Sequence, residues 1–183
     1  ADRLSGLLRM GNRDAFRELR PDLPPWKPPF DVAMDHASGA LAVYSDGNVI
    51  VLEPDAEGLY HLTAEGSAVA EDDQPALIAV AGERVLLAKE SGEIALLDRA
   101  TLDEQERHQL AGDQPPKRVI ASPDGRFFAV LAHDGRLWLY DRERGTDVSA
   151  SLPRQGDILA VAFDDESNLL IADRTTRVRA FPP

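Results

Sequence analysis

The side chains that could do chemistry are spread along this sequence without the spacing that a catalytic or metal site requires. The four histidines are scattered at His36, His61, His108 and His133, and no His-Glu-x-x-His or comparable ligand spacing surrounds them. The sequence contains neither a Gly-x-Ser-x-Gly nucleophile elbow nor a glycine-rich loop that would cradle phosphate. With no cysteine, disulfides and thiolate metal sites are excluded. We therefore assign no catalytic, cofactor-binding or metal-ligating residue and expect a protein that is not an enzyme.

Acidic residues recur in segments that the sequence predicts to be surface turns, at Asp35, Asp124 and Asp164-Asp165-Glu166. Carboxylates gathered on one rim could bind a cation. Alternatively, Asp side chains accept hydrogen bonds from nearby backbone amides and stabilise turns. We favour turn chemistry for these residues.

Composition limits the classes of partner. The chain has 183 residues, of which 43% are hydrophobic, and a net charge of −12. Because nucleic-acid binding depends on Lys and Arg, this balance argues against a nucleic-acid partner. No apolar run is long enough to cross a bilayer, and no segment resembles a signal peptide, so we expect a soluble chain as given. The first residue is Ala, so the compartment is left unassigned.

The elements that position these residues follow a repeat. One marker is a turn, an apolar run and a final acidic residue, as in Gly47-Asn-Val-Ile-Val-Leu-Glu53, Gly92-Glu-Ile-Ala-Leu-Leu-Asp98, Gly135-Arg-Leu-Trp-Leu-Tyr-Asp141 and the degraded Thr176-Arg-Val-Arg-Ala-Phe-Pro182. A second marker is an earlier turn residue, which falls at Gly39, Gly82, Gly125 and Ser167. Both markers recur about every 43 residues, so each copy is predicted to be one structural unit.

Each copy is interpreted as up to four short antiparallel strands, because apolar, β-branched and aromatic runs are separated by turns such as Asp46-Gly47. The expected strands of the first two copies (31–74 and 75–115) are Asp31–Asp35, Ala40–Tyr44, Val49–Leu52, Tyr60–Thr63, Leu77–Val80, Arg84–Ala88, Ile94–Leu97 and Glu104–Leu110. Those of the last two copies (116–155 and 156–183) are Arg118–Ala121, Phe127–Leu131, Leu137–Tyr140, Val148–Leu152, Leu159–Phe163, Leu169–Ala172 and Val178–Phe181. The fourth copy thus lacks an outermost strand.

These copies resemble the WD40 and related bacterial β-propeller repeats, whose period is about 40 to 45 residues and whose Trp-Asp dipeptide corresponds to Leu-Glu, Leu-Asp and Tyr-Asp here. The resemblance covers residues 31 to 183 and implies an all-β fold, a β-propeller-like array of about four antiparallel blades. The Gly-His signature and the Trp of the dipeptide are absent, so the hydrogen-bond network that they support in WD40 proteins is not carried over. A β-sandwich, which also has short strands at regular spacing, is the alternative architecture.

The N-terminal residues 1–30 differ from the repeats. Apolar residues at three- and four-residue spacing predict a short amphipathic helix, although Gly6 and Gly11 weaken it. The proline-rich segment Asp22–Phe30 is expected to be an extended arm. Residues 1–20 carry five Arg and three acids, so two roles stay open: the arm packs on the propeller, or it lies on a membrane surface.

The incomplete fourth copy leaves an exposed sheet edge, and such edges are usually paired or covered. Three explanations are open: the proline-rich arm covers the edge, another chain supplies the strand, or further blades complete a longer propeller. We favour completion by further blades or by another chain, and therefore expect self-association or capping of the edge.

Two local features have alternative interpretations. Trp138 is predicted to fill space between blades, at the repeat position of Ile50 and Ala95, rather than to stack on a ligand. The segment Thr101–Leu110 has a Thr-x-x-Glu capping box, so a short helix competes there with the outer strand.

The sequence therefore predicts a non-catalytic propeller scaffold that binds a protein or peptide partner. Two alternatives are a soluble accessory or sensor domain of a larger, membrane-transport protein, and a small-ligand-binding or enzymatic propeller that uses its central channel. The last requires polar residues from several blades to converge on one pocket.

Overall fold

The computed structural model describes residues 9–12, 15–18, 31–45, 47–67, 76–110, 114–149, 158–174 and 178–181. Within these ranges the chain is all-β, with no α-helix, and its strands form four antiparallel sheets and one separate hairpin. Side chains are described from Asp31 onward, except that of Arg179 and those in the gaps.

The four sheets follow one another along the chain. The first consists of β3 (Asp31–Met34), β4 (Leu41–Ser45), β5 (Asn48–Pro54) and β6 (Tyr60–Ser67), and the second of β7 (Ala76–Ala81), β8 (Arg84–Lys89), β9 (Glu93–Asp98) and β10 (Glu104–Gln109). The third consists of β11 (Pro116–Ala121), β12 (Phe127–Ala132), β13 (Leu137–Asp141) and β14 (Thr146–Asp147), and the fourth of β15 (Ile158–Phe163), β16 (Leu169–Asp173) and β17 (Val178–Phe181). In every sheet each strand pairs with the next strand in sequence, as in a propeller blade.

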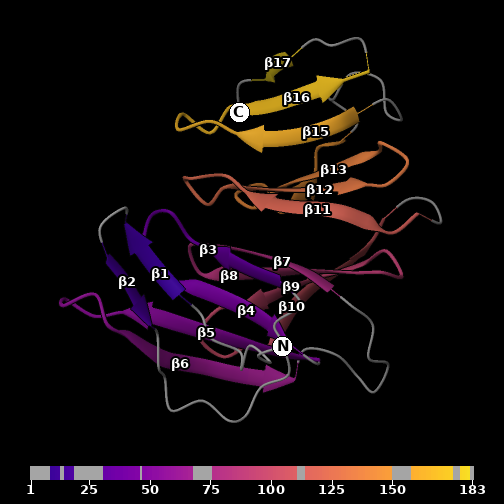
Figure 1. The fold of residues 1–183 in the computed structure, drawn as a ribbon. Coiled ribbons are helices and arrows are strands. Elements are labelled where there is room, and N and C mark those ends of the chain that lie inside the picture. Colours follow the sequence, from indigo (N-terminus) through magenta and orange to yellow (C-terminus); the bar gives the residue numbers. More distant parts are fainter. Residues whose placement is uncertain are drawn as a thin grey trace, which may run out of the picture.

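The sheets stack face to face in chain order, with the first and fourth at opposite ends of the stack (Figure 1). The innermost strands β3, β7, β11 and β15 are neighbours from sheet to sheet. The β-sandwich alternative is wrong, because a sandwich has two packed layers and this chain has four separate sheets. In the part of the chain that the structure describes, the four blades form an open array whose end sheets lie apart (Figure 1).

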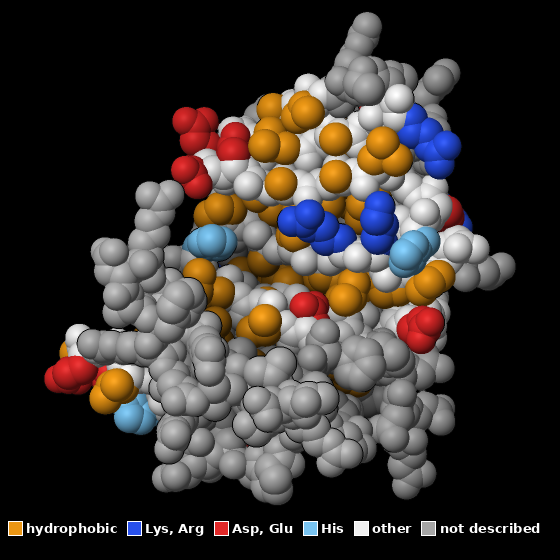
Figure 2. All heavy atoms as spheres, in the orientation of Figure 1, with side chains coloured by type: hydrophobic (Ala, Val, Ile, Leu, Met, Phe, Trp, Pro, Cys, Tyr) orange, Lys and Arg blue, Asp and Glu red, His pale blue; other side chains and the backbone are white. Residues whose placement is uncertain are grey.

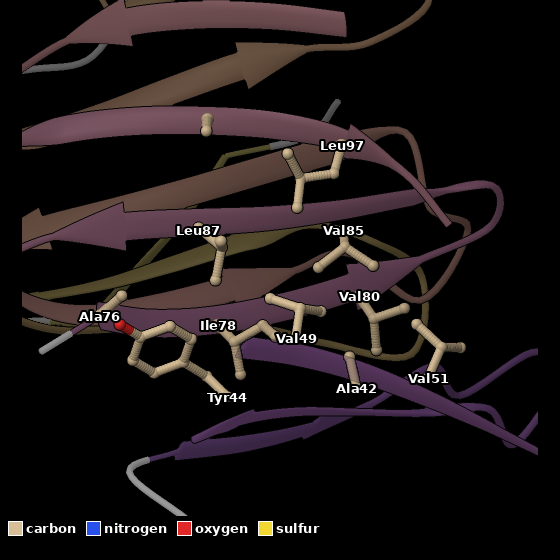
Figure 3. Packing of buried hydrophobic residues seen from close by; sticks show 11 residues of the cluster. Ala42, Tyr44, Val49, Val51, Ala76, Ile78, Val80, Val85, Leu87 and Leu97 are labelled. Atoms are coloured by element: carbon tan, nitrogen blue, oxygen red, sulfur yellow. The ribbon is translucent and has the colours of Figure 1, made fainter. Parts of the chain in front are cut away.

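Alternation along the strands gives each sheet two apolar faces. We call the face that is directed to the next sheet along the chain the forward face, and the opposite one the backward face. Forward residues of the first sheet and backward residues of the second share one buried cluster, and Figure 3 shows Tyr44, Val49 and Val51 gathered against Ile78 and Val80. Two further clusters join the second sheet to the third and the third to the fourth. The core is therefore a series of layers between sheets.

The turn between the first two strands of each sheet explains the second sequence marker. Gly39, Gly82 and Gly125 have φ angles of +74°, +54° and +70°, and Ser167 at the corresponding place has a φ of +63°. Glycine adopts this left-handed conformation without steric cost, whereas a side chain is strained there. The repeated glycine is thus a backbone requirement of the turn.

Two local predictions were wrong or incomplete, and one open alternative is settled. The N-terminal amphipathic helix is not formed at the described residues of that segment, where β1 (Arg9–Asn12) pairs with β2 (Ala15–Glu18), and Gly11 with the turn-forming Asn12 disfavours a helix there. The proline-rich segment lies outside the described residues. The outer strand predicted at Glu104–Leu110 is confirmed as β10, which pairs with β9, and the alternative helix does not form there. The outer strand predicted at Val148–Leu152 is instead the two-residue β14, and residues 150–152 lie outside the described ranges.

Candidate functional site

The histidines are positioned in different sheets and turns and do not converge. His61 Nε2 lies 2.7 Å from Asp55 Oδ2 in the first sheet, and His108 Nε2 lies 3.2 Å from Glu106 Oε2 on β10. Across the residues whose side chains are described, no group of three or more His, Asp or Glu side chains could hold a metal ion. The same residues contain no helix long and apolar enough to cross a membrane.

The acidic turn residues accept hydrogen bonds from their own turns. Asp35, which is buried, accepts hydrogen bonds from Ser38 Oγ at 2.6 Å and from the Ala37 amide at 3.2 Å. Asp164 Oδ1 accepts hydrogen bonds from two backbone amides, including that of Asn168 at 2.8 Å, and the Asn168 side chain lowers the pKa of Asp164. These carboxylates therefore act in turn chemistry, as expected.

Trp138 lies between the second and third sheets, as predicted from its repeat position. It belongs to the buried cluster that joins these sheets, and its ring stacks on Tyr140 with centroids 5.5 Å apart. His108 of β10 covers both rings at 5.5 and 5.2 Å. The Tyr140 hydroxyl donates to Glu106 Oε2 at 2.5 Å, and burial together with this carboxylate raises the pKa of Tyr140. This aromatic group holds two sheets together and is not an open ligand platform.

A groove of about 220 Å³ runs across the innermost strands of the first three sheets. β3 contributes Val32 and Met34, whose exposed fractions are 46% and 42%, and the buried Ile78 and Val80 of β7 form part of the lining. Figure 2 shows one face of the molecule, on which hydrophobic side chains are exposed over the sheets with Lys, Arg and His side chains among them.

Two polar side chains of this groove, those of Asp31 and Ser122, form hydrogen bonds within the chain, and His36 also lines it. Asp31 accepts hydrogen bonds from the amides of Val32 and Ile78, each at 2.9 Å, and so links β3 to β7. The buried Ser122 donates its hydroxyl proton to Asp124 at 2.5 Å and accepts a hydrogen bond from the Phe127 amide at 2.8 Å. The accessible surface of the groove is more polar than apolar, and the apolar side chains of β3 and β7 lie among these polar groups.

The forward face of the fourth sheet is a second apolar surface. Cross-strand pairing places on it Ala160, Ala162, Leu170, Ala172, Val178 and Ala180. None of these six residues is fully buried, and the exposed fraction of Val178 is 70%. β17 is the outermost described strand of this sheet, whereas the other three sheets each have a further strand beside the corresponding one.

The sequence analysis gave a central channel as an alternative binding place but named no residue of the groove, and it did not predict the forward face as a site. The groove combines residues from three repeats, and in one repeat its only signal is the pair of apolar side chains, Val32 and Met34, on an exposed innermost strand. The forward face could be recognised only after the register had shown which side of β16 and β17 faces the third sheet.

This arrangement of three four-stranded sheets and one three-stranded sheet, with innermost strands side by side, gives the described chain a β-propeller-type fold like that of WD40 repeats. No protein-family model matches the sequence, and no curated protein matches it. The similarity is therefore one of fold.

Solved structures share this fold at low sequence identity. The chain is similar to BamB from Moraxella catarrhalis, with 18% identity and a TM-score of 0.57, over 85% of this chain and 47% of that one. It is similar to the WD40 β-propeller domain of Doa1, with 14% identity and a TM-score of 0.62, over 96% of this chain and 57% of that one. The computationally designed Ika4 protein gives 14% identity and a TM-score of 0.57, over 85% and 91%. The chain thus spans about half the length of the two natural propellers.

Proposed function

We propose that this chain is a non-catalytic interaction domain that binds an extended protein or peptide segment in the groove along β3, β7 and β11. The observation that carries this proposal is the exposure of Val32 and Met34 beside the buried Ile78 and Val80. Apolar side chains of a bound segment can cover these two exposed residues. A concave surface that combines apolar side chains with polar groups is the usual form of a recognition site.

Chemistry of the groove favours binding over catalysis. The carboxylate of Asp31 and the hydroxyl of Ser122 are committed to hydrogen bonds that hold strands and turns. A catalytic site needs a nucleophile or base within hydrogen-bond reach of a reacting atom. For this reason the enzymatic use of the channel is not our proposal.

A selection from a library of random linear peptides on the full chain tests the proposal. The affinity of the selected peptides is then measured by fluorescence anisotropy for the wild type and for Met34→Glu. Burial of one such apolar side chain contributes about 1.5–3 kcal/mol, so we expect the substitution to weaken binding about tenfold or more.

Leu59→Glu is the matched control. Leu59 is also apolar and 53% exposed, but it lies in the turn between β5 and β6 and does not line the groove. Its substitution should leave the affinity within about twofold. Failure to select any peptide, or equal binding by the Met34→Glu variant, would contradict a groove-binding function.

A second proposal is that the chain serves as an accessory domain of a larger protein. The observation in its favour is that the chain spans 47% of BamB and 57% of the Doa1 propeller domain. An array of this length would present its two end sheets to other parts of such a protein.

A further inference from the structure

We infer that the partner segment bound in the groove is acidic where it crosses β11, so that its carboxylates pair with the side chains of Lys117 and Arg118. The inference rests on the groove-binding function proposed above and specifies the chemistry of its partner, an extended segment of another protein that carries Asp or Glu beside apolar residues. Three observations carry it: the two cations have no acidic partner among the described residues, they adjoin the groove, and the opposite end of the groove has a carboxylate of its own.

Cations without an acidic partner are unusual in this chain. Lys and Arg total 20 residues against 32 Asp and Glu, and the guanidinium groups of Arg84, Arg99 and Arg126 each form an ion pair with a carboxylate. Among the Lys and Arg side chains that the structure describes, those that form no ion pair are Lys117, Arg118, Arg142 and Arg174. Lys117 and Arg118 are the adjacent pair among them, and both are exposed.

The two cations adjoin the groove. They precede Val119 on β11, and Val119 lines the groove. Lys117 Nζ donates a hydrogen bond to the backbone oxygen of Leu159 at 3.1 Å, and so reaches the innermost strand of the fourth sheet. Because an ammonium has three N–H donors and a guanidinium five, both side chains keep donors for the carboxylate oxygens of a partner. On the face drawn in Figure 2, Lys and Arg side chains lie among hydrophobic ones.

The charge at the other end of the groove determines the order of residues in the partner. On β3, Asp31 lines the groove beside the exposed Val32 and Met34, and its carboxylate would repel an acidic side chain. β3, β7 and β11 follow one another with Cα atoms within 8 Å. Two such steps are roughly 16 Å, which about five extended residues span at about 3.4 Å each. We therefore expect an apolar residue over β3 and an acidic residue over β11, about five positions apart.

A second copy of this chain does not offer such a segment among its described residues. Asp164, Asp165 and Glu166 lie in a turn closed by hydrogen bonds, and the acidic residues of β10 belong to a strand that is already paired with β9. The net charge of −12 opposes an acidic partner at long range. At physiological salt, charges are screened beyond about 8 Å, so the nearby cations dominate the interaction.

Two peptide libraries test the chemistry of the partner on the full chain. Each has about eight random residues, enough to cross the groove in extended form, flanked on both sides by Glu-Glu in one library and by Lys-Lys in the other. The flanks are symmetric, so either chain direction brings the tested charges to β11. We expect binders from the Glu-Glu library.

The tightest of these peptides is then synthesised with its flanking Glu residues replaced by Gln and, separately, by Lys. Affinities are measured by fluorescence anisotropy at low and at high salt. Exposed ion pairs are weak one by one, so we expect the Gln form to bind about three- to tenfold more weakly than the Glu form and the Lys form more weakly still. The difference should shrink at high salt.

Lys117→Gln with Arg118→Gln tests the protein side of the interaction. Both side chains are exposed, so the double variant should fold normally and should lose the difference between the Glu and Gln peptides. Arg107→Gln with Arg144→Gln is the matched control, because it changes the net charge equally and its side chains, 56% and 68% exposed, do not line the groove. The control variant should keep the difference. Lys117→Glu with Arg118→Glu should reverse the preference toward the Lys peptide.

Equal affinities of the Glu and Lys peptides, or an unchanged charge preference in the variant with Lys117→Gln and Arg118→Gln, would overturn the inference. If the peptides are nevertheless weakened by Met34→Glu, the groove function stands and only the acidic partner is refuted. Failure to obtain any peptide from either library would refute both. A chain that is dimeric by light scattering, and monomeric once Lys117 and Arg118 are replaced by Gln, would also overturn the inference, because the occupant would then be a second copy.

Discussion

The carboxylate of Asp141 at the end of β13 should contribute more to stability than the acids at the same repeat position in other sheets. It is 1% exposed and accepts hydrogen bonds from Arg126 Nη2 at 2.8 Å and Nε at 3.2 Å. It also accepts a hydrogen bond from the Glu143 amide at 3.0 Å. The Arg126 guanidinium lowers the pKa of Asp141 below its usual range.

Asp141→Asn removes the charge and keeps the size of the side chain. Hydrogen bonds to charged groups contribute about 1.5–3 kcal/mol, and the asparagine oxygen can still accept the bond from the Glu143 amide. Arg126 is 25% exposed, so water can solvate it partly after the substitution. We therefore expect the free energy of unfolding at pH 7 to fall by about 2 kcal/mol, measured by urea denaturation.

The pH dependence follows from the lowered pKa of Asp141. A carboxyl with a lower pKa in the folded than in the unfolded chain stabilises the fold above about pH 4. This contribution is lost as the pH falls through the folded-state pKa, so the difference between wild type and Asp141→Asn should shrink between pH 7 and pH 3. Asp98→Asn is the matched control, because Asp98 has the same repeat position but is 29% exposed beside Arg84. Equal losses for the two variants, or a difference unchanged at pH 3, would refute the reasoning.

Five further substitutions test the packing, each by urea denaturation. Gly125→Ala should lower the free energy of unfolding by more than about 1 kcal/mol, because φ is +70° and the added Cβ would lie 3.3 Å from the Gly82 amide nitrogen. Gly58→Ala should lower it by less, because the space around Gly58 is open. Equal losses for the two variants would contradict this reasoning. Trp138→Ala should lower the free energy of unfolding by about 3–5 kcal/mol, because its ring fills the layer between two sheets. A loss below about 1 kcal/mol would show that the ring does not fill this layer. Ile171→Ala should lower the free energy of unfolding by about 2–4 kcal/mol, because Ile171 is buried against the third sheet. Leu170→Ala should lower it by clearly less, because Leu170 lies on the forward face. The reverse order would contradict the register.

The sequence was sufficient for the repeat and most strands because both depend on local constraints. The turn glycines Gly39, Gly82 and Gly125 adopt positive φ angles, which leaves a marker in every copy. The apolar runs such as β9 and β13 are buried on both faces, so they appear as continuous hydrophobic segments bounded by turns. The position of Trp138 between sheets followed from the same alternation.

The remaining features depend on tertiary contacts that a local pattern does not contain. Thr101–Leu110 has helix-forming residues, but the edge of β9 offers unpaired backbone groups, and pairing with them produces β10. A turn closed by the Asp98 carboxylate, which accepts a hydrogen bond from the Ala100 amide at 2.9 Å, directs the chain back along that edge. The candidate surfaces also cannot be recognised from the sequence, because Val49 and Val178 have the same residue type and repeat position, yet Val49 is buried and Val178 is 70% exposed.

Contacts between methyl groups test the open four-sheet array most directly. In a nuclear Overhauser spectrum of the methyl-labelled chain, we predict cross-peaks from Val51 to Val80 and from Leu139 to Ile171, which join successive sheets. The methyl groups of Val178 should show none to the first sheet. Cross-peaks between Val178 and first-sheet methyl groups, which would indicate a closed ring, or the absence of the Leu139 to Ile171 contact, would contradict the account.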